Sequence, residues 1–513
     1  MKAPFGLGFG VTALAAVGLL WSVGHFSDDF SYLHYQSTQQ SLWQALVPGS
    51  SFISLPLEQY THTFFLYFAD LQSSWLPGLL KMAYVVASLY MCSRFFSLFM
   101  SASLAHVVSF LFIFFPTHEA TVYWYLSQYL MLTVALYFYA YYLLQRGARR
   151  WAIVCAVMAS FMSYGSPAPA VAMTLLAWRR LGRSPAMLLL VPNLVYAAYY
   201  VVTSRVMGLG IQRLNDSDPS SLLRQLVLQK LTFVEATLGP SMWLKVFYGL
   251  GELTFVSGGL TLLALALFWR WHAVDTDRRH FAPDKALLLA LGAMTLVAFA
   301  MFAVTGRYPN IAFNLGNRTN IFGTALLAYL LVWAWSRWRA VAVVVVLLCF
   351  SATGLSNHWR RWSGLQDEAV VELQRTLDLH PELETVFVSG MQYSRLGAFD
   401  HIELFSEDWV ITSITELATD GRVRARPLNR NVEMLENGML VDVRYGDQHA
   451  VPEVLDVFDF DTHQLRRLPR DELNTYVRSL PRFRRHWLQA IESPRLQGWI
   501  LWLMPRLEYV FAS

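Results

Sequence analysis

The sequence predicts an α-helical polytopic membrane protein with about eleven transmembrane helices, followed by a C-terminal extracytoplasmic domain of the α/β or α+β class. The chain has 513 residues, of which 55% are hydrophobic and only 15% are charged, against roughly 25% charged in ordinary soluble domains. Residues 1–355 contain 22 Lys or Arg but 12 Asp or Glu, whereas residues 356–513 contain 18 and 24. We therefore divide the chain into a membrane body, residues 1–355, and an outer domain, residues 356–513.

Eleven apolar runs approach the length of about 20 residues that a helix needs to cross a bilayer. They lie near residues 5–24, 75–93, 98–116, 122–144, 151–163, 167–178, 186–203, 253–269, 286–305, 320–335 and 339–355. The fifth and sixth runs are short. The first run has only Lys2 before it and no small-residue cleavage site after it, so we read it as a span rather than a cleaved signal peptide.

The basic residues orient these spans. With the N-terminus in the cytoplasm, nearly every short basic cluster falls in a cytoplasmic loop, as the positive-inside rule requires. The clusters are Arg94, Arg146–Arg150, Arg179–Arg183, Arg270–Lys285 and Arg337–Arg339. The outer domain then lies in the periplasm if the membrane is a bacterial inner membrane, which this pattern fits. A eukaryotic membrane is the alternative.

Composition excludes several function classes. The net charge of +4 is small, and it is the sum of a basic membrane body and an acidic outer domain. It therefore does not indicate a nucleic-acid partner. The three cysteines, Cys92, Cys155 and Cys349, all lie in apolar runs without the spacing of a zinc site or a disulfide framework.

The first outer loop, residues 25–74, begins with "HFSDDF" and is rich in aromatic residues. Asp28 and Asp29 follow Ser27, a residue type that caps helices, and carboxylates are favoured in a first helical turn. That structural role is one interpretation. The other is chemical, because a carboxylate at a membrane boundary is costly unless it is used.

Two further outer loops carry candidate binding residues. "FPTHEATVYWY" places His118 and Glu119 between two spans, where Thr117 is the alternative helix cap. "TGRYPNIAFNLGNRTN", residues 305–320, supplies Arg307, Tyr308 and Arg318. The planar guanidinium group suits phosphate, although headgroup contact or pairing with acidic residues of other loops would also explain the two arginines. Lys245 faces the same side.

A stretch between residues 204 and 250 predicts a helix on the outer membrane surface. Asp218-Pro219 reads as its start, and Leu223, Val227, Leu231, Val234 and Leu238 form an apolar stripe at helical spacing. Such a helix either shapes the access route of a lipid substrate or merely packs against the body.

The outer domain shows mixed patterns. Ser363 and Gln366 read as a capping box ahead of a helix whose apolar face includes Ala369, Leu373 and Leu377. Residues 385–390 and 453–461 predict strands, and residues 431–445 predict a hairpin about Asn437-Gly438. No nucleotide loop, catalytic triad or metal motif is present.

The layout resembles the GT-C superfamily of polytopic glycosyltransferases, which take sugar from a polyprenyl-phosphate carrier. "SDDF" is similar to the acidic pair in the first outer loop of that superfamily. Pro116, His118, Glu119 and Trp124 are similar to a motif in its protein O-mannosyltransferase-like branch. The resemblance covers roughly residues 1–180. The chain departs from it in "SLPLEQY", which lacks an arginine, in "YGSPAPA", which replaces a Lys-Glu pair, and in having no tetratricopeptide repeats.

The resemblance implies transfer of a hexosyl or pentosyl group from a polyprenyl-phosphate-linked sugar to an extracytoplasmic acceptor, which is a glycan, a lipid or a protein. Asp28 or Asp29 would be the general base, with Asp29 slightly favoured, a role typically worth about 10²–10⁴-fold in rate. The expected substrate-binding residues are His118, Glu119, Arg307, Arg318, Tyr308 and Lys245. No cofactor is certain, and a divalent cation such as Mg²⁺ or Mn²⁺ at His118 and Glu119 is an open alternative.

Three other functions stay open at this point. "SYGSPAPA" would suit a broken helix of a transporter or lipid flippase, although no internal repeat accompanies it. An O-antigen-type ligase or polymerase would use a diphosphate-linked donor instead. A non-catalytic assembly protein would depend on its outer domain rather than on Asp28 and Asp29.

Overall fold

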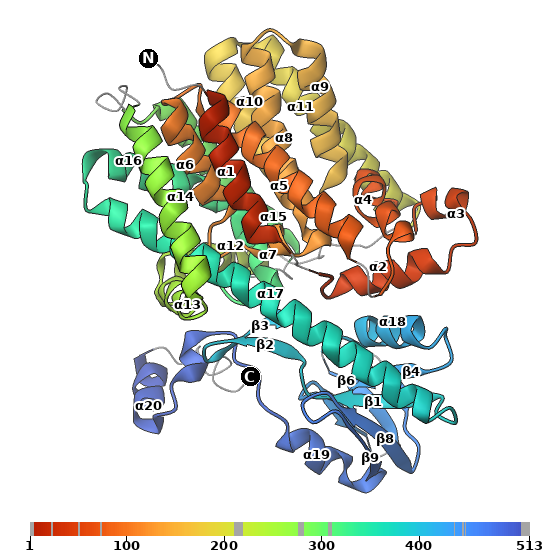
Figure 1. Ribbon diagram of the computed structural model, residues 1–513. Coiled ribbons are helices and arrows are strands. Elements are labelled where there is room, and N and C mark those ends of the chain that lie inside the picture. The colour runs from red at the N-terminus through yellow and green to blue at the C-terminus, as the bar shows by residue number, and fades with distance from the viewer. Residues whose placement is uncertain are drawn as a thin grey trace.

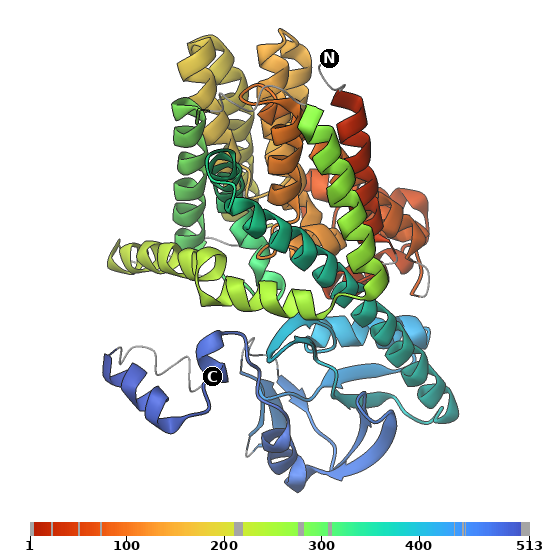
Figure 2. The ribbon, with the colours of Figure 1, turned by 60° about the vertical axis from the view of Figure 1, so that its left-hand side comes forward.

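The computed structural model describes residues 5–21, 24–49, 52–71, 74–209, 219–274, 282–305, 310–435, 437–443, 446 and 448–503. In this part of the chain a helical bundle stands on a smaller mixed α/β region (Figure 1). Helix α1 (Phe5–Leu20) begins at the end of the bundle far from the α/β region, and the last described helix, α20 (Pro494–Leu503), lies beside that region (Figures 1 and 2).

All eleven predicted apolar runs form helices. They are α1 (Phe5–Leu20), α5 (Trp75–Phe96), α6 (Ala102–Ile113), α8 (Gln128–Gln145), α9 (Arg149–Met162), α10 (Pro167–Leu181), α11 (Arg183–Val201), α14 (Phe255–Val274), α15 (Lys285–Thr305), α16 (Ile321–Arg337) and α17 (Val341–Leu379). Helix α8 is buried on nearly every side, as expected of an apolar helix at the centre of a bundle.

Five of the described helices are long and apolar enough to cross a membrane, which makes a multi-pass membrane protein the coarse class of the body. They are Trp75–Phe96, Arg183–Val206, Lys285–Thr305, Leu315–Arg337 and Val341–Leu379. A sixth span results if the bent pair Ser221–Gly251 and Phe255–Arg270, which meet at 111°, counts as one. The expected number of about eleven spans stays a prediction, because several of the helices are short.

Contacts between helix ends involve some of the basic clusters or lie next to them. Arg180 at the end of α10 pairs with Asp284 just before α15 and lies over the ring of Phe99, between α5 and α6. The rings of Trp269 on α14 and Trp335 on α16 are 6.3 Å apart. The two contacts bring the end of α10 close to the start of α15, and the end of α14 close to the end of α16. The side of the membrane on which these ends lie stays a prediction.

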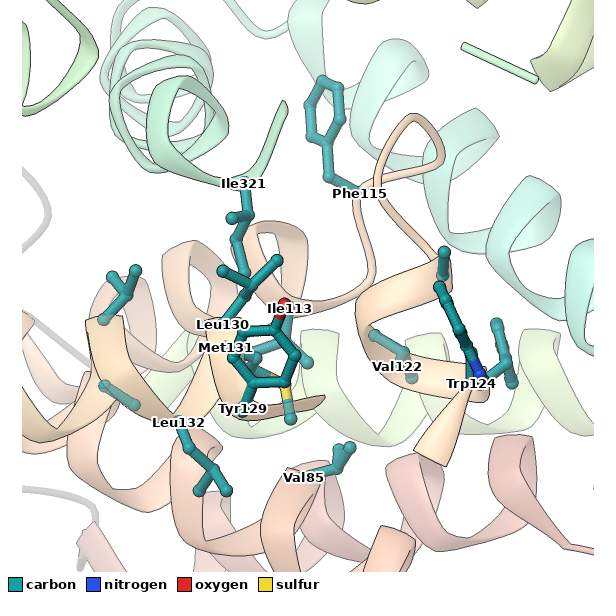
Figure 3. Close-up of a cluster of buried hydrophobic side chains, with 14 of the residues drawn as sticks. Val85, Ile113, Phe115, Val122, Trp124, Tyr129, Leu130, Met131, Leu132 and Ile321 are labelled. Carbon is teal, nitrogen blue, oxygen red and sulfur yellow. The ribbon is translucent and has the colours of Figure 1, made fainter. Parts of the chain in front are cut away.

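The bundle core is aromatic and aliphatic. Figure 3 shows the region where α5, α6, α8 and the start of α16 meet, with Val85, Ile113, Leu130 and Ile321 among the clustered side chains. The short segments α7 (Ala120–Tyr123) and η3 (Tyr125–Ser127) lead into α8 at this point. The second outer loop is thus packed into the core rather than exposed.

Two helices cross the lower end of the bundle, between it and the α/β region (Figure 2). They are α12 (Pro219–Leu238) and α13 (Pro240–Gly251). The stripe Leu223, Val227, Leu231, Val234 and Leu238 is exposed, while Gln229 on the other face is buried and accepts from Asn310. Helix α12 begins at Pro219 as predicted, and Asp218 lies outside the described residues.

The α/β region contains three small sheets. The first has the order β4-β1-β8-β9, in which β1 pairs in parallel with β4 and β8, and β8 pairs antiparallel with β9. The second is the hairpin β2-β3, and the third is β5-β6-β7. Their bounds are β1 (Thr385–Ser389), β2 (Tyr393–Leu396), β3 (Phe399–Glu403), β4 (Arg424–Pro427), β5 (Val432–Met434), β6 (Met439–Asp442), β7 (Gln448–Ala450), β8 (Val454–Asp459) and β9 (Gln464–Pro469).

The predicted strands at residues 385–390 and 453–461 correspond to β1 and β8, and the predicted hairpin corresponds to β5 and β6. Helices α18 (Asp408–Ala418), α19 (Leu473–Ser479) and α20 (Pro494–Leu503) complete this region. The face of α17 that carries Ala369, Leu373 and Leu377 is buried, as predicted.

One local prediction is wrong. Ser363 and Gln366 do not cap a new helix, because α17 runs without a break from Val341 to Leu379 and passes from the bundle into the α/β region (Figure 1). The predicted division at residues 355 and 356 therefore falls inside a continuous helix. Apolar residues on one face of this helix continue through both regions, and this burial outweighs the local capping signal.

Candidate functional site

The backbone before the two aspartates is held from several directions. The hydroxyl of Ser363 on α17 accepts from the amide of Gly24 at 2.9 Å, and the side chain of Gln366 donates to the carbonyl of His25 at 2.9 Å. Lys81 of α5 donates to the carbonyl of Gly24 at 2.5 Å. The two residues that suggested a helix cap thus fix the loop that leads to Asp28.

Helix α2 (Asp28–Ser37) starts with both aspartates in its first turn, as predicted. The side chain of Ser27 makes no capping bond, and its backbone is in the left-handed region at φ 50°. Such a conformation costs roughly 1–3 kcal/mol for a residue other than glycine and is most common at functional positions. The surrounding bonds therefore hold the chain in a strained turn directly before Asp28.

Asp29 is fully buried and both of its oxygens are used. One accepts from the amide of Phe26 at 3.0 Å, and the other accepts from the amide of Leu126 at 3.2 Å. Burial raises the pKa of Asp29 to about 7, against the opposing effects of the Lys81 charge and of the two amide bonds. Asp29 thus ties α2 to the second outer loop.

Asp28 has a different environment. Its side chain is partly exposed and accepts from the indole nitrogen of Trp409 at 2.8 Å. Trp409 belongs to α18 of the α/β region, so this bond joins the body to the outer domain. Of the two aspartates, Asp28 is the one that is partly exposed to solvent.

A second ionic cluster surrounds Glu119, far along the chain from its partners. One carboxylate oxygen, Oε1, lies 2.6 Å from Lys245 Nζ of α13, 2.9 Å from Asn317 Nδ2 and 2.9 Å from His401 Nε2 of β3. Glu119, Lys245 and His401 are all buried. The other oxygen, Oε2, has no hydrogen-bond partner among the described residues.

The protonation of this cluster follows from its geometry. The amide of Asn314, itself at φ 70°, donates to His401 Nδ1 at 3.3 Å, which leaves the proton on Nε2 facing Glu119. Burial, followed by the Lys245 charge, lowers the pKa of His401 to about 3, so this ring is neutral. Burial alone would raise the pKa of Glu119, but Lys245 and His401 lower it overall, so the carboxylate is ionised.

Trp359 of α17 lies between the two clusters. Its buried ring packs edge-on against Phe26 at 4.8 Å, stacks on Tyr123 at 5.4 Å and lies 6.1 Å from the ring of His401. Lys81 also donates to the carbonyl of Tyr123 at 3.1 Å. The aspartate pair and the Glu119 cluster are therefore parts of one rigid junction between body and outer domain.

The other predicted site residues make contacts outside the two clusters or cannot be placed. Both ring nitrogens of His118 are at hydrogen-bond distance from neighbouring groups. Nε2 lies 2.6 Å from the carbonyl oxygen of Phe112, and Nδ1 lies 3.0 Å from Thr121 Oγ1. The His118 side chain therefore does not contact Glu119. The Arg318 guanidinium lies 4.7 Å above the ring of Trp124. Arg307 and Tyr308 lie outside the described residues.

The side chains near Glu119 do not suit a divalent cation. His118 points away, Lys245 supplies the positive charge, and no group of three or more His, Cys, Asp or Glu in the described part of the chain could hold a metal ion. Thr117, the alternative cap of the loop, makes no hydrogen bond through its buried hydroxyl with any residue that the structure describes, and α7 begins only after Glu119.

Four important residues were not identified from sequence. Lys81 had a usable signal, because a charged residue within an apolar run indicates a buried partner or a function. Asn317, His401 and Trp409 had none, since each acts through a contact with a distant segment.

An apolar cavity of about 480 Å³ opens in the bundle between α1, α6, α14 and α17. Leu14, Phe110 and Leu260 are among its apolar lining residues, and Asn357 and Arg360 are polar ones. Its size is within the range of about 300–1,000 Å³ that is typical of ligand sites, and its lining suits an apolar chain.

Comparison with known protein families and with curated proteins identified no match. No protein-family model matches the chain, and no curated protein is significantly similar to it.

Proposed function

We propose that this protein is an integral membrane glycosyltransferase of the GT-C type. It would move a hexosyl or pentosyl group from a polyprenyl-phosphate carrier to an extracytoplasmic glycan, lipid or protein. The proposal depends mainly on one observation, namely the contacts that hold the Asp28 carboxylate in place. A partly exposed carboxylate is held at the junction of body and outer domain by Trp409, next to a strained Ser27 and a locked Asp29.

In this proposal the general base is Asp28 and not Asp29, the residue that the sequence slightly favoured. The acceptor hydroxyl attacks the anomeric carbon while the bond from that carbon to the carrier phosphate breaks, and the electron pair leaves with polyprenyl phosphate. The hydroxyl proton passes to the Asp28 carboxylate. A single displacement of this kind inverts the anomeric centre. Asp29 acts as a positioning residue, because its oxygens are already bonded to Phe26 and Leu126.

Two features favour a lipid-borne substrate. The cavity between α1, α6, α14 and α17 has an almost entirely apolar lining, apart from groups such as Asn357 and Arg360. The exposed apolar stripe on α12 would be stabilised by contact with the bilayer at its boundary with water. Arg318 is our candidate for stabilising the phosphate leaving group, since preorganised charges act strongly where water is excluded.

The proposed location is a bacterial inner membrane, with the N-terminus in the cytoplasm and the α/β region in the periplasm. There the carrier would approach from the bilayer and the acceptor from the periplasm. The junction that holds Asp28 is accessible to both in this orientation.

The deciding experiment measures release of polyprenyl phosphate by the purified protein. The donors are a panel of polyprenyl-monophosphate sugars, and the acceptor is a crude cell-envelope fraction. We expect wild-type turnover, a loss of at least about 100-fold in Asp28→Asn, and a smaller loss in Asp29→Asn. Asp378→Asn, an exposed carboxylate paired with Arg422, is the matched control and should retain full activity.

Other results would redirect the assignment. Consumption of a diphosphate-linked donor alone would favour the ligase or polymerase reading. Wild-type activity in Asp28→Asn would remove Asp28 as the base, and a sugar covalently attached to Asp28 or Asp29 would exclude the single displacement.

A further inference from the structure

The α/β region contains a second cavity, of about 460 Å³, beneath the β2-β3 hairpin. The segment that follows α19 closes it and is held to the hairpin by two hydrogen bonds between Asp400 and Arg484. The amide of Asp400 donates to the carbonyl of Arg484 at 2.8 Å, and the amide of Arg484 donates to the Asp400 carboxylate at 2.5 Å. The cavity is therefore formed by the fold and not by a loose loop.

Among the described residues, four arginines line this cavity, Arg395, Arg430, Arg482 and Arg484, and Asp400 is the one acidic residue in its lining. Arg482 makes no side-chain hydrogen bond or ion pair with any described residue. Arg395 only approaches Asp400, at 3.8 Å. These two cations are consequently available to a ligand.

The remaining two arginines are held in place. Arg430 donates from Nε to the carbonyl of Leu480 at 2.7 Å, which leaves its terminal nitrogens for another acceptor. Arg484 lies 3.1 Å from Glu492, a side chain that does not line the cavity. Side chains oriented in this way lose little freedom when they bind a ligand, which improves affinity.

The charges around the cavity do not balance. Asp400 offsets one of the four arginines and Glu492 a second, which leaves an excess of two positive charges. A phosphate monoester carries roughly −1.5 to −2 at neutral pH and offers three oxygens to planar guanidinium groups. A carboxylate would leave one positive charge uncompensated.

This cavity is separate from the Glu119 cluster, although the same strand contributes to both. Successive residues of a strand point to opposite faces, so Asp400 lines the cavity while His401 reaches Glu119. A ligand can bind here without disturbing the junction at Asp28.

We propose that the cavity lined by Arg395, Arg430, Arg482 and Arg484 binds a phosphate monoester group. The group belongs either to an anionic lipid headgroup or to a soluble phosphate ester. The site does not depend on the proposed transferase reaction, and its test leaves that reaction untouched.

The test uses the full-length purified protein. Calorimetric titration with inorganic phosphate and with glycerol 3-phosphate examines the soluble source. Hydrogen exchange of residues 479–484 in bilayer discs containing phosphatidic acid, compared with discs of phosphatidylcholine alone, examines the lipid source. The variant is Arg395→Gln with Arg482→Gln, because Arg482 makes no side-chain hydrogen bond or ion pair with a described residue and Arg395 makes only the long ion pair with Asp400 at 3.8 Å.

The control is Arg375→Gln with Arg467→Gln, which removes two exposed arginines of surface ion pairs outside the cavity. We expect binding of a soluble probe, or protection in phosphatidic acid discs, that weakens at least about tenfold in the variant and stays unchanged in the control. A soluble response identifies a phosphate ester, and a response in discs alone identifies a headgroup. Absence of both responses, or equal loss in the control, would overturn the proposal.

Discussion

The buried pair of Lys245 and Glu119 gives the sharpest stability prediction. Lys245 Nζ lies 2.6 Å from Glu119 Oε1, and the two side chains are 0% and 3% exposed. At an effective dielectric constant of about 20, Coulomb's law gives an attraction of about 6 kcal/mol at this distance. Desolvation offsets part of it, and removal of one partner of a buried pair typically costs about 3–5 kcal/mol.

Lys245→Met should therefore be strongly destabilised, because it leaves an ionised carboxylate buried with only neutral donors. Asn317 still reaches the Ala312 carbonyl that Lys245 contacts, so the lost charge is the main effect. At about 2 °C per kcal/mol for a large chain, the expected fall in Tm is about 6–10 °C. Thermal unfolding in detergent, followed by tryptophan fluorescence and by elution volume, measures it.

The double variant Glu119→Gln with Lys245→Met separates charge from packing. A glutamine at this position can still accept from Asn317 through Oε1, the oxygen that lies 2.9 Å from His401 Nε2 in the wild type. Its amide nitrogen takes the place of Oε2, which has no partner among the described residues. We expect the double variant to be more stable than Lys245→Met alone. Lys230→Met, an exposed lysine on α12, should be neutral. A double variant no more stable than Lys245→Met would refute the reasoning.

Three more predictions concern packing, protonation and the membrane surface. A Cβ on Gly354 of α17 would lie 1.7 Å from the carbonyl oxygen of Gly249, whereas one on Gly364 of the same helix meets nothing within 4 Å. Gly354→Ala should therefore lower Tm, while Gly364→Ala should raise stability by about 0.5–1 kcal/mol; equal effects would contradict the close helix packing. The pKa of Asp29 in the folded protein, about 7, is higher than the ordinary value of 3.8 for this side chain, so the folded state holds an extra proton between these values and loses stability as pH rises through them. Tm measured from about pH 5 to about pH 8 should fall less in Asp29→Asn than in the wild type, and parallel curves would count against the raised pKa. Spin labels at positions 231 and 230 of α12 should report lipid contact and water contact respectively, because Leu231 is on the exposed apolar stripe; equal access to water at both would argue against a surface helix.

Much of the secondary structure could be predicted from sequence, because its signals are local. Each apolar run forms a helix, α2 begins at Asp28, and β1 and β8 coincide with predicted strands. The capping box at Ser363 failed, although its residues suit such a cap. Burial of one face of α17 along its whole length carries the helix through that position, so tertiary contacts overrode a local preference.

The candidate site could be predicted only in part. Sequence identified Asp28, Asp29, Glu119 and Lys245 as residues of one face, but it assigned no pairings among them. The two aspartates are adjacent and chemically identical, yet Asp29 is locked by the amides of Phe26 and Leu126 while Asp28 remains accessible. Burial creates that difference, and burial depends on which segments pack around each side chain.

The sequence by itself determined a membrane body of apolar helices, a more polar C-terminal region, and the acidic turn that joins the first helix to the second. These follow from hydropathy and from short-range backbone preferences, which need no distant partner. The tertiary structure alone decided that Glu119 meets Lys245, 126 positions away, and His401 of the α/β region. Ionic contacts between buried groups form only where folding brings distant segments together and excludes the water that would otherwise solvate each charge.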